Sequence, residues 1–385
     1  MTKAASVLLV LAGVVVLVLV FIAVPAIKNL RAPRESMFTS IRVFDGMRVL
    51  DNQTVVVQGG RFTEVYSPEK GWMRSVSSNA RVIRGEGKTL LPGFIDAHVH
   101  LEFYDPKRVL KGGITTARDT GWPAVKIFPL VERLASDPGA GPFLLASGPM
   151  ITARNGYPTS AGWAPAGTAL QISNAEEGRQ AVKRLKTQGA TVIKVAQDSR
   201  QGPVLSTTVL GEVVQQAHEL GLKVTSHLGT LDELEVALEA GVDELAHGLW
   251  SDEVIPDAMI RRMVDAGMTV VPTLHIDPSP QRIDNLRRFL SAGGKVIYGT
   301  DMGNSGPPPG IDVVELQLMI EAGMSPLEAL ASATAKAASY LRLQDRGRIA
   351  QGFVADLIMV EGNPLEDLGV LSKPVLVMRQ GKTAD

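Results

Sequence analysis

The segment LLPGFIDAHVH, residues 90–100, decides the fold of this chain. It has the pattern of a short apolar strand that is entered through Pro-Gly and ends in two histidines two positions apart. Alternate side chains of a strand point to the same side, so His98 and His100 can both point into one cavity at the end of the strand. Two imidazoles in this arrangement can bind one metal ion. A histidine pair can equally lie on a surface by chance, and the rest of the chain decides between these interpretations.

Strand-like and helix-like segments alternate after this stretch. Helical spacing is present at Leu231, Leu234 and Leu238, and residues 325–328, SPLE, have the form of a helix capping box. Eight alternating strands and helices over about 250 residues are typical of a (β/α)8 barrel. The alternative, a doubly wound open sheet, needs a Gly-rich phosphate loop after its first strand, which this sequence lacks. The strand candidates are Phe94–His100, Gly113–Asp119, Phe143–Ile151, Thr191–Ala196, Lys223–His227, Val242–His247, Thr269–Leu274 and Lys295–Gly299.

The predicted barrel, residues 90–344, is flanked by two β-like segments. Residues 37–89 and 345–385 contain short strand patterns around glycine turns, and no helical period precedes the barrel. We expect the two flanking segments to pair with each other. The predicted fold is therefore α/β: a TIM barrel inserted into a small β-sandwich domain that is built from both ends of the chain.

Residues 1–36 comprise a predicted membrane anchor and a polar linker. Residues 4–27 form an uncharged run of 24 residues. At a rise of about 1.5 Å per residue, such a run can cross a hydrocarbon core of about 30 Å as a transmembrane helix. A cleaved signal peptide, for which Val24-Pro25-Ala26 is a poor cleavage site, and a buried helix are the alternatives. The flanking basic residues do not define an orientation. Because N-terminal segments of this kind commonly serve export, we expect an extracytoplasmic domain.

The composition excludes several kinds of partner and site. Lys and Arg total 39 and Asp and Glu total 40, for a net charge of −1, so the chain has no electrostatic footprint for nucleic acid. The absence of cysteine excludes thiolate metal sites, disulfides and thiol nucleophiles. A small-molecule substrate remains as the expected partner, and the sequence is compatible with a homo-oligomer.

Metal-capable side chains lie at the ends of five of the predicted strands. The active site of such a barrel lies at the carboxyl ends of its strands. Taken singly, each side chain also has a structural interpretation, as a packed histidine, a loop cap or an edge-strand lysine. A lysine inside an apolar strand is nevertheless costly unless its charge is paired or removed. Their joint placement on one rim predicts a metal site formed by His98, His100, Lys194, His227, His247 and Asp301.

These six residues resemble the ligand set of the amidohydrolase superfamily. Three further segments are also similar to sequence motifs that are typical of that superfamily: PGFID (92–96), GITTARD (113–119) and GFVADL (352–357). The resemblance extends from about residue 37 to residue 385, and it is greatest to the branch of imidazolonepropionase-like hydrolases and Xaa-Pro dipeptidases, or prolidases. It implies two divalent metal ions, usually zinc. It also implies which residues bind them: His98, His100 and Asp301 one ion, His227 and His247 the other, with a carboxylated Lys194 bridging both.

The resemblance further implies hydrolysis of an amide, peptide-like or N-acyl, by a hydroxide that bridges the two metals and attacks the carbonyl. Asp301 would act as the catalytic residue that takes a proton and delivers it to the leaving nitrogen. Mononuclear cyclic-amide hydrolases and deaminases of the superfamily usually carry an acidic or amide residue where this chain has Thr230. A lactonase could use the same metals. A non-catalytic binding barrel would be expected to lose ligands, and none is missing here.

The long loop at residues 152–163 is the predicted source of substrate selection. Its Arg154 could hold a carboxylate, and its Tyr157 and Trp163 could hold an apolar side chain. A packed surface loop is the alternative. His275, after the seventh strand, is a further candidate for substrate contact. Prolidases often have a Gly-Gly-His type of sequence in this loop, whereas this chain has Gly-Tyr-Pro at 156–158, which weakens the expectation of a dipeptide substrate.

Overall fold

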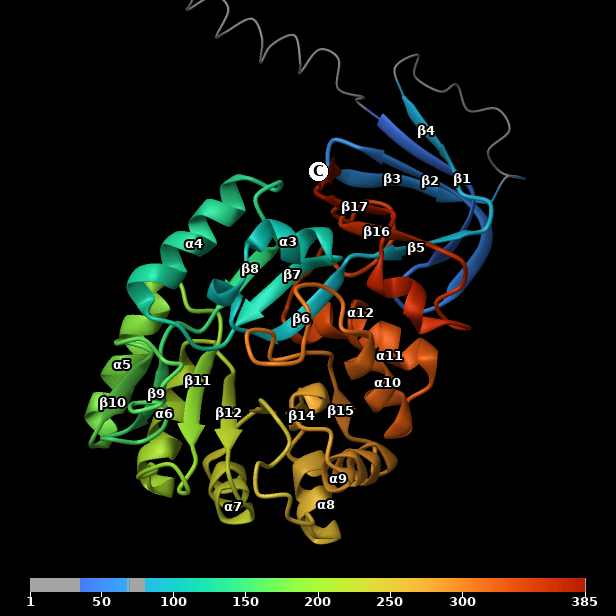
Figure 1. The fold of residues 1–385 in the computed structure, drawn as a ribbon. Helices are drawn as coiled ribbons and strands as arrows, with labels where there is room; N and C mark the ends of the chain where they lie inside the picture. The colour runs from blue at the N-terminus through green and yellow to red at the C-terminus, as the bar shows by residue number, and fades with distance from the viewer. Residues whose placement is uncertain (1–34, 68, 70–79, 385) are drawn as a thin grey trace, which may run out of the picture.

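The computed structural model describes residues 35–384, apart from residue 68 and residues 70–79 (Figure 1). The predicted transmembrane helix at residues 4–27 lies outside the described residues. Among the helices that are described, none combines the length and the apolar character needed to cross a membrane.

The predicted barrel is present. Its strands belong to two parallel sheets, one of three strands in the order β6-β7-β8 and one of seven in the order β10-β9-β11-β12-β13-β14-β15. The backbone N–H of Thr191 donates to Ala146 at 2.9 Å, which connects β8 with the segment that leads into β11. The backbone N–H of Ala97 donates to Tyr298 at 3.1 Å, which connects β6 with the segment that follows β15. The strands are β6 (Phe94–Val99), β7 (Ile114–Asp119), β8 (Phe143–Ala146), β9 (Met150–Ala153), β10 (Ala169–Ile172), β11 (Ile193–Gln197), β12 (Val224–Leu228), β13 (Glu244–Leu245), β14 (Thr269–Val270) and β15 (Lys295–Val296).

Helices surround these strands, as Figure 1 shows. The spacing of Leu231, Leu234 and Leu238 corresponds to α7, and the capping box at Ser325 is confirmed at the start of α11. The predicted third strand differs from the structure, because the chain breaks at residues 147–149 into β8 and β9. The helices are α3 (Pro106–Lys111), α4 (Ala124–Ser136), α5 (Ala175–Gln188), α6 (Thr207–Glu219), α7 (Leu231–Ala240), α8 (Asp257–Asp265), α9 (Pro280–Ser291), α10 (Val313–Glu321), α11 (Pro326–Ser332) and α12 (Ala335–Tyr340), with 3-10 turns η1 (Leu101–Phe103), η2 (Leu274–Ile276) and η3 (Leu368–Ser372).

Both ends of the described chain join one eight-stranded sheet, in which β5 pairs with β16 and Leu91 lies opposite Ile358. In Figure 1 the first strands, in blue, and the last, in red, lie side by side. The hydrogen bonding is continuous, whereas the predicted β-sandwich would have two separate sheets. The sheet contains β1 (Glu35–Phe44), β2 (Val49–Gln58), β3 (Arg61–Tyr66), β4 (Arg81–Arg84), β5 (Lys88–Pro92), β16 (Leu357–Glu361), β17 (Leu376–Arg379) and β18 (Lys382–Thr383).

An irregularity in β1 explains this difference. The register of β1 against β2 shifts between Phe38 and Ile41, where Ser40 has a φ of 52°. β1 then pairs with β4 before this point and with β5 after it. Because a bulge bends and twists a strand, one sheet can curl around a core of its own. The curl brings Arg61 of β3 into an antiparallel bridge with Val354.

The segment at residues 90–100 connects the two parts of the molecule. It forms two strands, the end of β5 in the curled sheet and then β6 in the barrel, whereas the sequence pattern predicted one. The change of direction at Gly93 requires a glycine, because a Cβ there would lie 2.2 Å from the side chain of Thr115. β6 then carries His98 and His100 to the rim of the barrel.

Candidate active site

The six predicted ligands lie around one site at the carboxyl ends of the barrel strands. Five of them line a pocket of about 550 Å³, and His98 is completely buried beside it. The other residues that line the pocket come mainly from the loops that follow the strands. They are Phe103, Met150, Tyr157, Ala161, Gly162, Trp163, Arg200, Gln201, Trp250, Gly303, Asn304 and Ser305.

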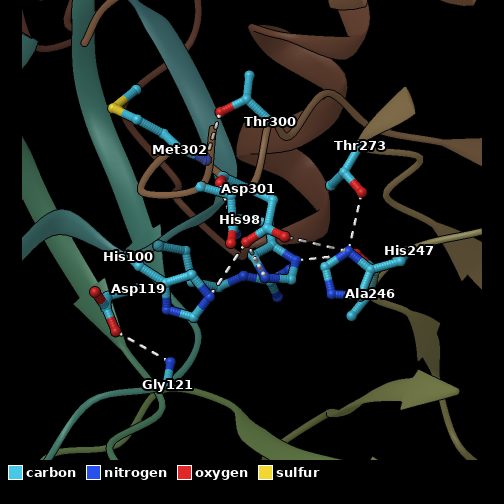
Figure 2. Close-up of polar contacts among 12 residues, drawn as sticks. His98, His100, Asp119, Gly121, Ala246, His247, Thr273, Thr300, Asp301 and Met302 are labelled. Atoms are coloured by element: carbon cyan, nitrogen blue, oxygen red, sulfur yellow. Dashed lines mark hydrogen bonds and ion pairs between the residues drawn. The ribbon is translucent and has the colours of Figure 1, made fainter. Parts of the chain in front are cut away.

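Asp301 occupies the centre of the ligand group. Its Oδ1 atom lies 3.4 Å from Nε2 of His98 and 3.2 Å from Nε2 of His100, and its Oδ2 atom lies 3.8 Å from Nδ1 of His247. Figure 2 shows the three imidazoles converging on this carboxylate. Atoms of His98, His247 and Asp301 that can bind a metal all lie within 4.8 Å of one another. A single cation could therefore contact all three side chains.

Hydrogen bonds to the Nδ1 atoms hold two of these histidines. Nδ1 of His98 lies 2.9 Å from the carbonyl of Ala246, and Nδ1 of His247 lies 2.9 Å from Oγ1 of Thr273. The carbonyl can only accept, so Nδ1 of His98 carries the proton and Nε2 keeps its lone pair. Burial lowers the pKa values of both histidines well below the usual value, which keeps them neutral, as metal binding requires.

Asp96 connects the first and last strands of the barrel at this site. Its carboxylate accepts hydrogen bonds from Oγ1 of Thr300 at 2.6 Å, from the Thr300 backbone N–H at 3.1 Å and from the His98 backbone N–H at 3.1 Å. Burial raises the pKa of Asp96 to about 7. The neighbouring Asp301 has a φ of 56°, in the left-handed region, and its N–H donates to the carbonyl of His98 at 2.8 Å. Sequence analysis did not single out Asp96, although it lies within the PGFID motif.

Lys194 is the second residue of β11 and is completely buried. Its Nζ atom has no hydrogen-bond partner among the described residues. Burial lowers the pKa of Lys194 to about 7, so a large share of the amine is neutral and nucleophilic near neutral pH. An unpartnered buried amine is costly. The structure therefore places at this site a group whose burial needs a compensating modification or partner.

The unpartnered atoms of the site fit a divalent cation. Within the described residues, buried atoms without a hydrogen-bond partner include Nε2 of His98, Nζ of Lys194 and Oδ1 of Asp301. Buried polar groups are rarely left without partners, and such a cluster indicates a missing ligand. Nitrogen and carboxylate oxygen donors, with no sulfur, suit zinc among other divalent ions.

His227 is held between two aromatic rings and a carboxylate. Its ring stacks at centroid distances of 4.7 Å on Tyr157 and 5.9 Å on Trp250, and its Nε2 atom lies 3.5 Å from Oδ2 of Asp198. Burial works to raise the pKa of Asp198, but the nearby His227 ring and the hydrogen bonds from Arg200 and Gln201 outweigh it and lower that pKa. Carboxylates behind metal-binding histidines commonly orient them. Sequence analysis missed Asp198, whose only signal is its place directly after the strand of Lys194.

The predicted substrate residues separate into two groups. Tyr157 and Trp163 line the pocket, where Nε1 of Trp163 donates to the Tyr157 hydroxyl at 3.2 Å. Arg154 is exposed and is not among the lining residues; its Nε donates to Oγ of Ser173 at 3.1 Å. His275 is likewise absent from the lining, and its Nδ1 atom lies 2.6 Å from Oδ2 of Asp312.

Curated proteins with similar sequences include two enzymes. A curated relative is the ochratoxinase of Aspergillus niger, 24% identical over 375 residues, which cover 80% of this chain and 76% of the relative. Another is the imidazolonepropionase of Pyrobaculum arsenaticum, 30% identical over 195 residues, which cover 47% of this chain and 45% of the relative. The predicted resemblance to imidazolonepropionase-like hydrolases is therefore confirmed.

A solved structure and a family model complete the comparison. A Xaa-Pro dipeptidase with methionine bound in its active site superposes with a TM-score of 0.79 at 24% identity, over 91% of this chain and 99% of that one, which shows the same fold. The model of the Amidohydrolase family, whose members are metal-dependent, matches residues 89–384. The chain belongs to the Amidohydrolase family and is a hydrolase that acts on carbon–nitrogen bonds.

Proposed function

We propose that the chain is a binuclear amidohydrolase that hydrolyses peptide-like or N-acyl amides. The observation that carries this proposal is the completely buried Lys194, which lines the same pocket as the histidines. Within the described part of the chain, its Nζ atom has no hydrogen-bond partner. Carboxylation by carbon dioxide would convert this amine into an anionic oxygen ligand, and would remove the cost of burying it alone. In this proposal His98, His100 and Asp301 would hold one zinc ion, His227 and His247 would hold the other, and carboxylated Lys194 would supply the shared ligand.

The side chains of the site divide the chemistry among them. Two bound divalent ions would acidify a water molecule and polarise the substrate carbonyl. Asp301 would accept a proton of the attacking water and deliver it to the leaving nitrogen. Tyr157, Trp163 and Trp250 cover His100 and His227 with aromatic rings and exclude bulk water from them.

Metal content of the Lys194→Ala protein tests the proposal. We expect the wild-type protein to bind two zinc ions per chain and the variant to bind at most one, with at least about a 100-fold lower kcat, since the bridging oxygens are lost. Metal is measured by mass spectrometry, and the carboxylated lysine is detected by ¹³C NMR after exposure to ¹³CO₂. Lys183→Ala, which removes an exposed lysine of α5, is the matched control.

Normal metal content and rate in the Lys194→Ala protein would contradict the bridging role. One ion per chain with an unmodified lysine would favour the mononuclear alternative, which the close grouping of His98, His247 and Asp301 could serve. Thr230 does not supply a proton shuttle for such an enzyme, because it forms the capping box of α7 with Glu233. Assays with lactones alongside N-acyl amides distinguish the lactonase alternative.

We also propose that residues 4–27 anchor the protein in a membrane and leave the hydrolase domain extracytoplasmic. The uncharged run in the sequence supports this proposal. We expect the full chain to sediment with membranes and residues 37–385 to remain in the supernatant. Protease protection of the domain in sealed vesicles then measures its side of the membrane. A full chain that stays in the supernatant, or a trimmed protein recovered from the host, would contradict the anchor.

A further inference from the structure

The walls of the active-site pocket are aromatic. Phe103, Tyr157, Trp163 and Trp250 all line it. Tyr157 and Trp163 brace each other through the hydrogen bond between them, and the ring of Trp163 lies 5.3 Å from that of His100. Large rigid rings beside a reacting centre favour an aromatic or apolar substrate group.

Among the lysines and arginines of the described residues, Lys194 and Arg200 line the pocket. Lys194 becomes anionic in the proposed carboxylated state. Arg200 is neutralised, because its Nε and Nη2 atoms each donate at 2.9 Å to the two oxygens of the Asp198 carboxylate. Its Nη1 atom donates to the carbonyl of Trp250 at 2.8 Å. This bidentate pairing uses the donor geometry with which an arginine would bind a substrate carboxylate.

The nearby cations outside the pocket are also engaged. Arg282 lies over the ring of Trp250 at 4.3 Å and forms ion pairs with Asp252 and Asp277. His275 contacts Asp312, and Arg154 points to Ser173. A substrate carboxylate that lay against these aromatic rings, away from the proposed metal ions, would lose its hydration without gaining a free cationic side chain among the described residues. Burying a charge without such a partner is strongly unfavourable.

We propose that the substrates are uncharged amides with an aromatic or apolar substituent, and that the pocket discriminates against substrates with a free carboxylate. This inference rests on the proposed amide hydrolysis and gives its substrate class. It separates this chain from an enzyme for free dipeptides, and it attributes the selectivity to the Asp198–Arg200 pair and to the rings of Tyr157, Trp163 and Trp250.

A matched pair of substrates tests the inference on the zinc-loaded full chain. Benzanilide and 4-benzamidobenzoate share the scissile amide and differ in one carboxylate. We expect kcat/KM to be at least about 100-fold higher for benzanilide, and its binding, followed by tryptophan fluorescence, to be tighter to a similar degree. Ser305 is exposed and lines the pocket, so Ser305→Arg should raise the relative kcat/KM of the anionic substrate by about tenfold, whereas Ser305→Gln should not.

Binding and turnover separate the two proposals. Equal or tighter binding of the anionic compound overturns the substrate class, whatever the turnover. Selective binding of the neutral compound supports the proposed substrate class even if neither compound is hydrolysed. In that case the absence of hydrolysis contradicts the proposed amide hydrolysis and leaves the substrate class standing. An equal effect of Ser305→Arg and Ser305→Gln on the two compounds would also overturn the electrostatic basis of the selectivity.

Discussion

Replacing Asp301 with asparagine is expected to lower kcat by about 10²–10⁴-fold, the range typical for loss of a general acid–base group. The carboxylate lies 3.2 Å from Nε2 of His100 and 3.4 Å from Nε2 of His98. Among the ion pairs of the described residues, no other carboxylate contacts as many of the proposed ligands. Asparagine has nearly the same shape and tolerates the left-handed backbone at this position, where φ is 56°. It cannot take up a proton. Steady-state kinetics with an N-acyl amide and metal analysis of the same preparation measure the effect.

Asp252→Asn is the matched control for this substitution. Asp252 also has a left-handed backbone, with a φ of 57°, but it is exposed and does not line the pocket. We expect its kcat to stay within about twofold of the wild type. A normal kcat in the Asp301→Asn protein with two ions bound would exclude Asp301 from proton transfer. Loss of activity that parallels loss of metal would instead assign Asp301 a ligand role alone.

Among the proposed substitutions, Arg118→Met is expected to lower the free energy of unfolding the most. Arg118 and Glu244 form an ion pair of 2.6 Å inside the barrel, with side chains only 2% and 1% exposed. Nε of Arg118 also donates to the carbonyl of Ala97 at 2.7 Å. Arg118→Met leaves the Glu244 carboxylate buried without its charged partner, which costs about 3–5 kcal/mol in comparable sites. Urea unfolding followed by circular dichroism measures this change.

The double substitution Arg118→Met with Glu244→Leu distinguishes a broken pair from a replaced one. We expect it to recover most of the lost stability, since apolar side chains of similar volume often replace a buried pair at little cost. Arg42→Met, which breaks the exposed pair with Asp51, should change the unfolding free energy by less than about 1 kcal/mol. If Arg118→Met behaved like Arg42→Met, the Arg118–Glu244 pair would contribute little to the barrel.

The sequence predicted the barrel and the positions of its six candidate ligands. Two regularities made this possible. Side chains alternate along a strand, which places His98 and His100 on the same side of β6. Parallel strands of a closed barrel also end on one rim, so residues near the ends of strands far apart in sequence, such as His227 and Asp301, converge there. Both regularities depend on local periodicity and on the order of the elements, which the amino-acid sequence records directly.

The tertiary structure decided the features that depend on contacts between distant, irregular segments. Arg118 and Glu244 are 126 positions apart, and no local pattern pairs them. The irregularity of β1 at Ser40 accompanies the curl that brings both ends of the described residues into one sheet. The pocket also depends on contacts between distant loops. Trp250 and Tyr157 both stack on the ring of His227, and Asp198 neutralises Arg200. Arg154 lies outside the lining. Loop conformation has no repeating period, so the sequence alone determined the location of the chemistry, and only the folded loops determined the charge and shape that a substrate meets.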